Sequence, residues 1–198
     1  MKVLNLYAGI GGNRRLWRDC EVTAVENNAK IAAIYNDLYP KDIMYLEDAH
    51  EFLLENYAEY DFIWTSPPCP THSSFRFNIG VRFRNVKPVY PDMTLYQEII
   101  LLSTHFKGKW VVENVKPYYD PLIKPTIQLQ RHLFWTNFDI KEKAFVKDDL
   151  RNAQIPELQK LHNVDLTKYN ISNKRQILRN CTRSDIGEYI YEQATKIH

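Results

Sequence analysis

Short apolar runs alternate with helix-patterned segments along most of the chain, and this alternation limits the available folds more than any other feature. Strands are predicted over residues 2–7, 21–26, 43–46, 61–65 and 110–115, with a last apolar run over 132–138. Helices are predicted over residues 29–38, 49–57 and 93–106, with a short helix through Leu16 and Trp17. Strands separated by helices pair in parallel, so we expect one doubly wound α/β sheet.

The last third of the chain has a different pattern. Residues 141–174 are polar, charged and weakly periodic, which predicts a small appendage without a core of its own. The tail from Leu178 to Gly187 predicts a loop that leads into a short helix ending near Ala194.

Composition excludes several classes of protein. With 198 residues, of which 44% are hydrophobic, the chain has enough apolar mass for one compact domain. No apolar run approaches the roughly 18 residues of a membrane span, and the first residues turn polar too soon for a secretory signal, so we expect a cytoplasmic protein. Three cysteines without a CxxC pair favour neither a disulfide framework nor a zinc site, and no metal is expected.

Three of only six glycines lie at positions 9, 11 and 12, directly after the first predicted strand. Glycines at the carboxyl end of a strand let a ligand approach the backbone in an open α/β sheet. Glu26 ends the second strand and offers acceptors for ribose hydroxyls, and Asp48 follows the third and offers one for an adenine amino group. The spacing GxGG departs from the dinucleotide pattern GxGxxG. The plainer alternative is a tight turn with two surface acids.

Cys69 follows the fourth predicted strand and lies among Pro67, Pro68 and Pro70. Prolines make a stiff loop, and a stiff loop beside a ligand site can position a nucleophile. The reactive form of cysteine is the thiolate, which local positive potential favours. A buried structural cysteine is the alternative interpretation.

The thirty residues from Phe62 to Pro91 contain no aspartate or glutamate. Their cations Arg76, Arg82, Arg84 and Lys87 are interleaved with the aromatic side chains of Phe75, Phe77, Phe83 and Tyr90. Basic groups contact phosphates and aromatic rings stack on bases, so this segment predicts a nucleic-acid surface. A solvated basic loop is the alternative. The net charge of the whole chain is only +2, so any such signal is local.

The fifth predicted strand ends in Glu113, Asn114 and Val115, at the same edge of the sheet as Cys69. A carboxyl group placed there can be protonated and donate to a ring nitrogen of a base. The alternative is a salt-bridged glutamate at a strand end.

The order of these blocks resembles the cytosine-5 DNA methyltransferase family in its short, phage-type form. The segment from Tyr7 to Gly12 is similar to the cofactor block, Pro67-Pro68-Cys69 to the Pro-Cys block and Glu113-Asn114-Val115 to the Glu-Asn-Val block. Arg131 falls in the arginine block, and Arg179-Asn180 is similar to the C-terminal block that folds back onto the cofactor pocket.

The resemblance implies a sheet of the S-adenosylmethionine-dependent methyltransferase type and a reaction on double-stranded DNA. Cys69 adds to carbon 6 of a flipped-out cytosine, Glu113 stabilises charge at nitrogen 3 and Arg131 binds the oxygen at carbon 2. The residues implied to bind S-adenosylmethionine are Tyr7, Ala8, Gly9, Ile10, Gly11, Gly12, Glu26, Asn27, Asp48, Ala49, Pro67 and Asn180. The residues implied to contact DNA are Ser73, Ser74, Arg76, Arg82, Arg84 and Lys87.

The implied organisation is a catalytic domain over residues 1–140, a reduced target-recognition appendage over 141–173 and a segment over 174–198 that returns to the catalytic domain. Such a protein would work in a bacterial cell or a phage-infected host, for example in restriction-modification. Pro70 stands where the family commonly has glutamine, and the arginine block carries one arginine where the family alternates two.

Three other functions remain open at this point. A methyltransferase acting on tRNA cytosine shares the same blocks and has a reduced recognition region. An amino-group methyltransferase for N4-cytosine or N6-adenine has a Ser-Pro-Pro-aromatic block similar to Ser66-Pro67-Pro68, but an aromatic residue there takes the place of Cys69. A decayed enzyme would only bind DNA.

Overall fold

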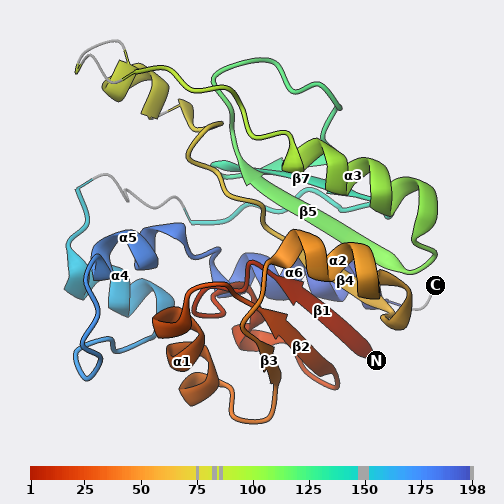
Figure 1. Ribbon diagram of the computed structural model, residues 1–198, viewed down its shortest axis with the longest axis horizontal. Helices are drawn as coiled ribbons and strands as arrows, with labels where there is room; N and C mark the ends of the chain where they lie inside the picture. Colours follow the sequence, from red (N-terminus) through yellow and green to blue (C-terminus); the bar gives the residue numbers. More distant parts are fainter. Residues whose placement is uncertain (75, 82–83, 85–86, 147–151, 197–198) are drawn as a thin grey trace.

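The computed structural model describes residues 1–74, 76–81, 84, 87–146 and 152–196. Its centre is a seven-stranded sheet in the order β3-β2-β1-β4-β5-β7-β6 (Figure 1). Neighbours from β3 to β5 pair in parallel, whereas β7 is antiparallel to both β5 and β6. The strands are β1 (Lys2–Leu6), β2 (Glu21–Val25), β3 (Ile43–Tyr45), β4 (Phe62–Thr65), β5 (Lys109–Val115), β6 (Ile127–Leu129) and β7 (His132–Thr136). The doubly wound, mostly parallel sheet predicted from the sequence is confirmed.

Helices cover both faces of this sheet. The α-helices are α1 (Ala29–Leu38), α2 (Ala49–Asn56), α3 (Thr94–His105), α4 (Ile155–His162), α5 (Lys174–Asn180) and α6 (Ser184–Thr195). Three shorter helical segments are η1 (Asn13–Leu16), η2 (Tyr57–Glu59) and η3 (Arg76–Val81), the last of them a π-helix. None of the helices in the described part of the chain is long and apolar enough to cross a membrane.

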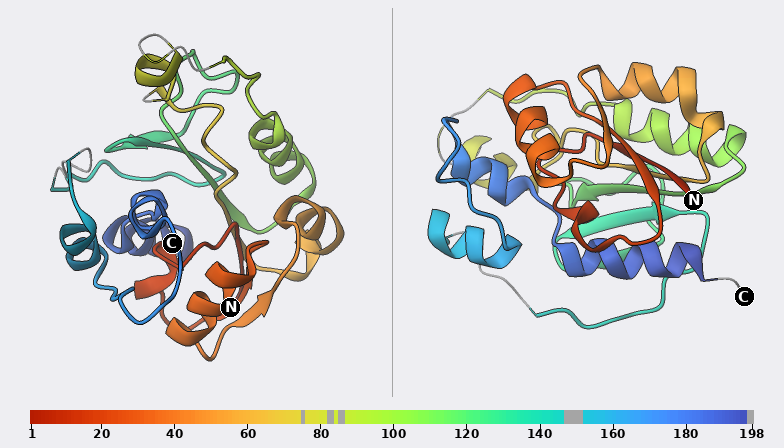
Figure 2. Two further views of the ribbon diagram at one scale, coloured as in Figure 1. Left: turned by 60° about the vertical axis from the view of Figure 1, so that its left-hand side comes forward. Right: turned by 90° about the horizontal axis from the view of Figure 1, so that it is seen from below.

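The side chains of the strands belong to two apolar layers, one on each face of the sheet, because successive residues of a strand point to opposite faces. Leu4 and Ile63 pack on one face with residues of α2 and α3. Val3 and Trp64 point to the other face, where they pack with Trp17 and with residues of α6. Figures 1 and 2 show α2 and α3 together on one side of the sheet and α6 on the other. Loops at the carboxyl ends of the parallel strands are therefore held by a rigid frame.

Four local predictions were wrong or incomplete. The short helix after the glycines is a single 3-10 turn, η1, and the predicted long loop after β4 contains the π-helix η3. The tail forms α5 before α6, so its predicted loop is reduced to residues 181–183. Strand β6 was not predicted, because three residues with alternating exposure give little sequence signal.

The described part of the appendage contains a helix that its weak periodicity did not predict. Helix α4 begins with a capping box between Gln154 and Glu157 and ends at Asn163, which has a left-handed backbone (φ 49°). A small apolar cluster includes Leu158, Val164 and Leu166 of this region together with Ile10, Ile34 and Leu178 of other segments. The appendage is thus packed onto the glycine turn, α1 and α5.

Candidate active site

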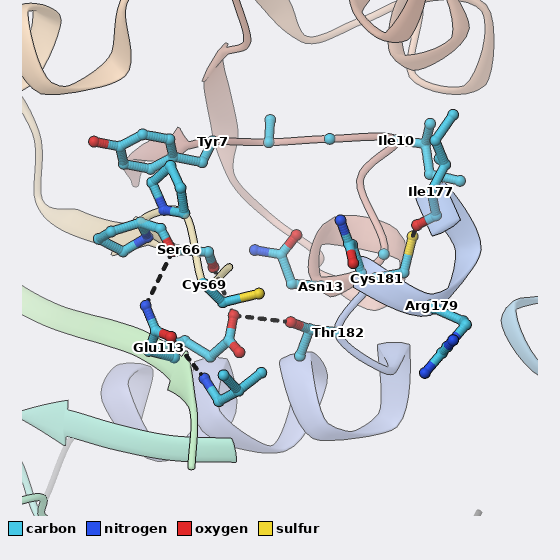
Figure 3. A pocket seen from close by; sticks show the side chains of 18 of the residues that line it. Tyr7, Ile10, Asn13, Ser66, Cys69, Glu113, Ile177, Arg179, Cys181 and Thr182 are labelled. Carbon is cyan, nitrogen blue, oxygen red and sulfur yellow. Dashed lines mark hydrogen bonds between the residues drawn. The ribbon is translucent and has the colours of Figure 1, made fainter. Parts of the chain in front are cut away.

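A cavity of about 320 Å³ lies where the parallel strands end. Its walls come from the turn after β1, the loop after β4, the end of β5 and the segment around α5, as the close view in Figure 3 shows. Many residues proposed from the sequence line it: Tyr7, Ala8, Gly9, Ile10, Gly12, Glu26, Asn27, Pro67, Cys69, Glu113, Arg131 and Asn180. Residues more than 100 positions apart in the sequence therefore meet in one pocket.

The backbone turn after β1 is open to the cavity at Gly9. Gly9 has a left-handed backbone (φ 55°), and a Cβ added there would have no atom within 4 Å. Its N–H donates to Glu26 Oε2 at 3.0 Å, while Glu26 Oε1 accepts from the N–H of Asn28 at 2.9 Å. The carboxylate of Glu26 thus braces the turn and lines the cavity at the same time.

The other two glycines of the cluster serve internal packing. A Cβ at Gly11 would lie 2.3 Å from Cε2 of Tyr39, and one at Gly12 would lie 2.5 Å from the carbonyl oxygen of Thr182. Gly11 does not line the cavity. Glycine is therefore favoured at position 11 by the left-handed backbone (φ 74°) and the neighbouring ring of Tyr39, and at position 12 by the backbone of the C-terminal segment, a reason that the sequence pattern alone did not reveal.

Asp48 and Ala49 also lie outside the cavity lining. Asp48 is the N-cap of α2, and its Oδ1 accepts from the N–H groups of His50 and Glu51 at 2.9 and 3.1 Å. Ala49 is buried in the core. Capping is a sufficient structural reason for an aspartate here, and adenine recognition by Asp48 stays a prediction.

Beneath the turn lies a buried acid that the sequence interpretation missed. Glu98 of α3 is fully buried and accepts from Tyr7 Oη at 2.7 Å and from Thr65 Oγ1 at 2.5 Å. His50 Nδ1 is 3.1 Å from the same carboxylate, and this hydrogen bond raises the pKa of His50. One carboxylate therefore connects the glycine turn, the end of β4 and α2.

The loop that carries Cys69 is tied down at both ends. Asn114 is buried and its Nδ2 donates to the carbonyl oxygen of Pro67 at 3.0 Å. After the cysteine, the N–H groups of His72 and Ser73 donate to the carbonyl oxygen of Cys69 at 3.0 and 3.1 Å. These contacts, added to the prolines, fix the position of the cysteine backbone.

The thiol of Cys69 is partly buried, and burial raises its pKa above the ordinary value. The neighbouring charge of Glu113 raises the pKa further, while Arg131 lowers it. The contribution of Arg131 therefore does not outweigh that of burial.

Glu113 is almost fully buried beside Cys69. Its Oε2 accepts from Ser66 Oγ at 2.8 Å and from Thr182 Oγ1 at 3.1 Å. His132 Nε2 lies 3.5 Å from Oε1, and burial lowers the pKa of His132 to about 4, so this imidazole is neutral near pH 7. Figure 3 shows Cys69, Glu113 and Thr182 gathered at one part of the cavity, with the hydrogen bond between Glu113 and Thr182 drawn.

Arg131 lines the same cavity and is held by the C-terminal segment. Its Nη2 donates to the carbonyl oxygen of Arg179 at 2.5 Å. Burial lowers the pKa of this guanidinium, and the charges of Glu113 and Cys69 counteract that effect. Arg131 is thus a cation close to both proposed catalytic groups.

The cavity residues that were not proposed from the sequence include Ser66, His132 and Thr182. Ser66 precedes the Pro-Cys block and His132 follows Arg131. Thr182 comes two positions after Asn180, the end of the C-terminal block. Adjacency to those blocks was the available signal, but their shared partner Glu113 is visible only in the folded chain.

Three of the proposed DNA-contacting residues lie beside the Pro-Cys loop. Ser73, Arg76 and Lys87 line a small depression of about 30 Å³ next to Pro70. Arg84 is exposed and Ser74 is half-buried. Arg82, together with the aromatic residues Phe75 and Phe83, lies outside the described residues. The ring of Phe77 stacks on Tyr118 with centroids 4.3 Å apart, so this aromatic packs within the protein.

A comparison with models of protein families matches residues 1–126 to the C-5 cytosine-specific DNA methylase family. The match spans more than half of the chain, and the chain belongs to this family. The strand order with an antiparallel β7 is that of S-adenosylmethionine-dependent methyltransferases. A search among curated proteins finds no match.

Several solved structures are similar to this one. A putative DNA modification methyltransferase encoded within a prophage (E. coli) is 16% identical, with a TM-score of 0.46 over 80% of this chain and 54% of that protein. A mutant DNMT2 of Spodoptera frugiperda is 25% identical, with a TM-score of 0.39 over 58% and 35%. An Agrobacterium tumefaciens SAM-dependent methyltransferase is 18% identical, with a TM-score of 0.39 over 60% and 40%. The chain thus spans between about a third and a half of these three proteins.

Proposed function

We propose that the protein methylates carbon 5 of cytosine in double-stranded DNA, with S-adenosylmethionine as methyl donor and Cys69 as covalent nucleophile. The observation that carries the proposal is the single cavity in which Cys69, Glu113 and Arg131 meet the turn at Gly9. These three side chains supply a nucleophile, an acid and a cation beside the backbone of Gly9, where no side chain blocks a ligand. Family membership supports carbon 5 as the target over an exocyclic amino group.

The residues present fit the cofactor. The open space at Gly9 admits a ligand against the backbone, and the carboxylate of Glu26 faces the same cavity with acceptor capacity for ribose hydroxyls. Tyr7 and Ile31 supply apolar walls for an adenine ring. When bound, S-adenosylmethionine would supply an electrophilic methyl group. The cavity volume is within the range of small-molecule sites.

The chain's own groups account for the activation of cytosine. Cytosine carbon 5 is a weak nucleophile, and addition of the Cys69 sulfur to carbon 6 makes carbon 5 enamine-like. Glu113 provides a hydrogen bond or a proton at nitrogen 3, and Arg131 binds the oxygen at carbon 2. After methyl transfer, carbon 5 loses its proton to water, and Cys69 is eliminated as the carbon 5–carbon 6 double bond re-forms.

The DNA must bring the base to this cavity by base flipping, because carbon 6 is not reachable inside a duplex. The basic residues Arg76, Arg84 and Lys87 lie on the segment that follows the Pro-Cys loop and would hold the neighbouring phosphates. We assign target recognition to residues 141–173, of which Leu158, Val164 and Leu166 pack in one apolar cluster with residues of α1 and α5.

Bisulfite sequencing of a duplex incubated with protein and S-adenosylmethionine tests this proposal. We expect 5-methylcytosine at a defined subset of sites from the wild type and from Cys20→Ser, and none from Cys69→Ser. Cysteine 20 is a matched control because it is also partly buried but does not line the cavity. Methylation by Cys69→Ser would overturn the covalent mechanism. Product only on a parallel tRNA substrate would overturn the assignment to DNA.

A further inference from the structure

The two oxygens of Glu113 have different surroundings. Oε2 receives two hydroxyl donors, from Ser66 at 2.8 Å and from Thr182 at 3.1 Å, whereas Oε1 lies toward His132 at 3.5 Å. A carboxyl oxygen has two lone-pair directions. The hydrogen-bonding capacity of Oε2 is therefore filled by the protein, while that of Oε1 is not.

The direction of the Ser66 hydrogen bond is fixed by a third residue. The indole Nε1 of Trp64 is 2.9 Å from Ser66 Oγ, and an indole nitrogen is only a donor. Ser66 therefore accepts from Trp64 and must use its own hydrogen toward Glu113. Trp64 is fully buried, so this chain of donors is anchored in the core.

Thr182 completes the arrangement from another segment of the cavity wall. Its side chain is nearly fully buried, and it comes from the segment between α5 and α6. A proton on Oε2 would point to the oxygen of Thr182, so it would not be available for a hydrogen bond to the base. A proton on Oε1 has no competing hydroxyl among the described contacts of that atom.

The tautomer of His132 agrees with this assignment. Its Nδ1 is buried without a hydrogen-bond partner in the described structure, and buried N–H groups without a partner are rarer in proteins than buried acceptors without one. The hydrogen of the neutral ring therefore belongs on Nε2, which faces Oε1 of Glu113. His132 and the base would then share the free oxygen.

We propose that Thr182 is a positioning residue: with Ser66 it holds Oε2 of Glu113, so that Oε1 alone meets the target base. This inference rests on the proposed function and adds a role for the C-terminal segment, which supplies no group that itself reacts. Removal of the hydroxyl would let the carboxyl group rotate and place its proton on either oxygen.

Single-turnover methylation at saturating DNA and cofactor tests the inference. Thr182→Val removes the hydroxyl but keeps the shape of the side chain. We expect its methylation rate to fall by about tenfold or more, the loss expected for one hydrogen bond to a charged group. The KM for DNA and the calorimetric affinity for S-adenosylhomocysteine should stay within about twofold, and Thr182→Ser should restore the rate.

The matched control is Thr104→Val, the same chemical change at an exposed position of α3 away from the cavity. Thr182→Ala replaces Thr182→Val if the latter melts below the assay temperature. A wild-type rate in the variant lacking the hydroxyl overturns the inference. So does a loss confined to the KM for cofactor, or failure of serine to restore the rate. Absence of methylation by the wild type itself would instead overturn the proposed function.

Discussion

At the scale of single residues, the proposed reaction depends on the ionisation of Cys69. Burial and the charge of Glu113 raise the pKa of this thiol, so the thiol form dominates in the free protein near neutral pH. Arg131 acts in the opposite direction. The reactivity of the nucleophile is therefore set by three groups that meet only in the folded chain.

The rate of alkylation of Cys69 by iodoacetamide should increase with pH up to and beyond pH 8.5, because the ordinary pKa of a cysteine thiol is about 8.5. In Arg131→Gln, the pH dependence of this alkylation rate should shift to still higher pH. The rate at pH 8 should fall severalfold, because the positive charge that lowers the pKa of Cys69 is lost. Peptide mass spectrometry separates the three cysteines, and Cys181, whose pKa burial raises to about 12, serves as an internal slow control. A faster reaction in Arg131→Gln would contradict this electrostatic description.

Sequence patterns identified residues whose chemistry is local and missed those whose role depends on a distant partner. Cys69 is marked by its prolines and Glu113 by its place at the end of a strand. Thr182 is an ordinary polar residue until the C-terminal segment brings it 3.1 Å from Glu113. Asp48 shows how a local pattern can be ambiguous. An acid directly after a strand fits a ligand site, but it also fits a helix N-cap, which is the role that the structure shows.

At the scale of secondary-structure elements, Glu98 connects α3 to α2 and to the ends of β1 and β4. The charge of this buried carboxylate is balanced in part by His50, whose pKa is raised by their hydrogen bond. A histidine whose pKa is higher in the folded state stabilises the fold most below its unfolded pKa of about 6.5. That stabilisation is lost as pH rises through the raised pKa of the folded state.

His50→Gln should therefore lower the free energy of unfolding by about 1 kcal/mol near pH 6 and by less at pH 8.5. The difference between wild type and variant in urea unfolding is the quantity to measure, because His72 and His132, whose pKa values are lowered by burial, contribute in the opposite direction. His105→Gln, at the exposed end of α3, is the matched control. An equal loss of unfolding free energy at both pH values would rule out a charged pair between His50 and Glu98.

Elements with strong periodicity and clear end signals were predicted well. Helix α1 has the predicted bounds, with Asn28 capping its first turn. The π-helix η3 and strand β6 escaped prediction because short elements lack a distinct period. Helix α4 escaped because the apolar cluster that contains its Leu158 is built with Ile10 and Ile34, from segments far away in the sequence.

At the scale of the whole molecule, the C-terminal segment completes the site. The family match ends at residue 126, yet Arg131, Asn180 and Thr182 line the same cavity as Cys69. Helix α6 packs on the sheet, and Gly187 accepts from Trp17 Nε1 through its carbonyl oxygen at 3.1 Å. The site is therefore a property of the entire fold rather than of the matched blocks alone.

The basic residues after the Pro-Cys loop should contribute to DNA affinity through phosphate contacts. Single replacement of Arg76, Arg84 or Lys87 by alanine should reduce the slope of log affinity against log salt by up to about 0.9, whatever the base sequence. Affinity for S-adenosylhomocysteine should not change. Lys109→Ala is the control, because Lys109 is exposed at the start of β5, far along that strand from Glu113. An unaltered slope in all three variants would leave this segment without a DNA role.

A duplex containing 5-fluorocytosine tests whether Cys69 forms a covalent bond with cytosine. Fluorine cannot leave carbon 5 as a proton would, so the enzyme is trapped after methyl transfer. With S-adenosylmethionine present, we predict a denaturant-stable complex whose digested peptide carries the nucleotide on Cys69, and no such complex from Cys69→Ser. Wild-type protein that binds duplex and cofactor but forms no adduct, or an adduct on Cys20 or Cys181, would contradict the covalent role of Cys69.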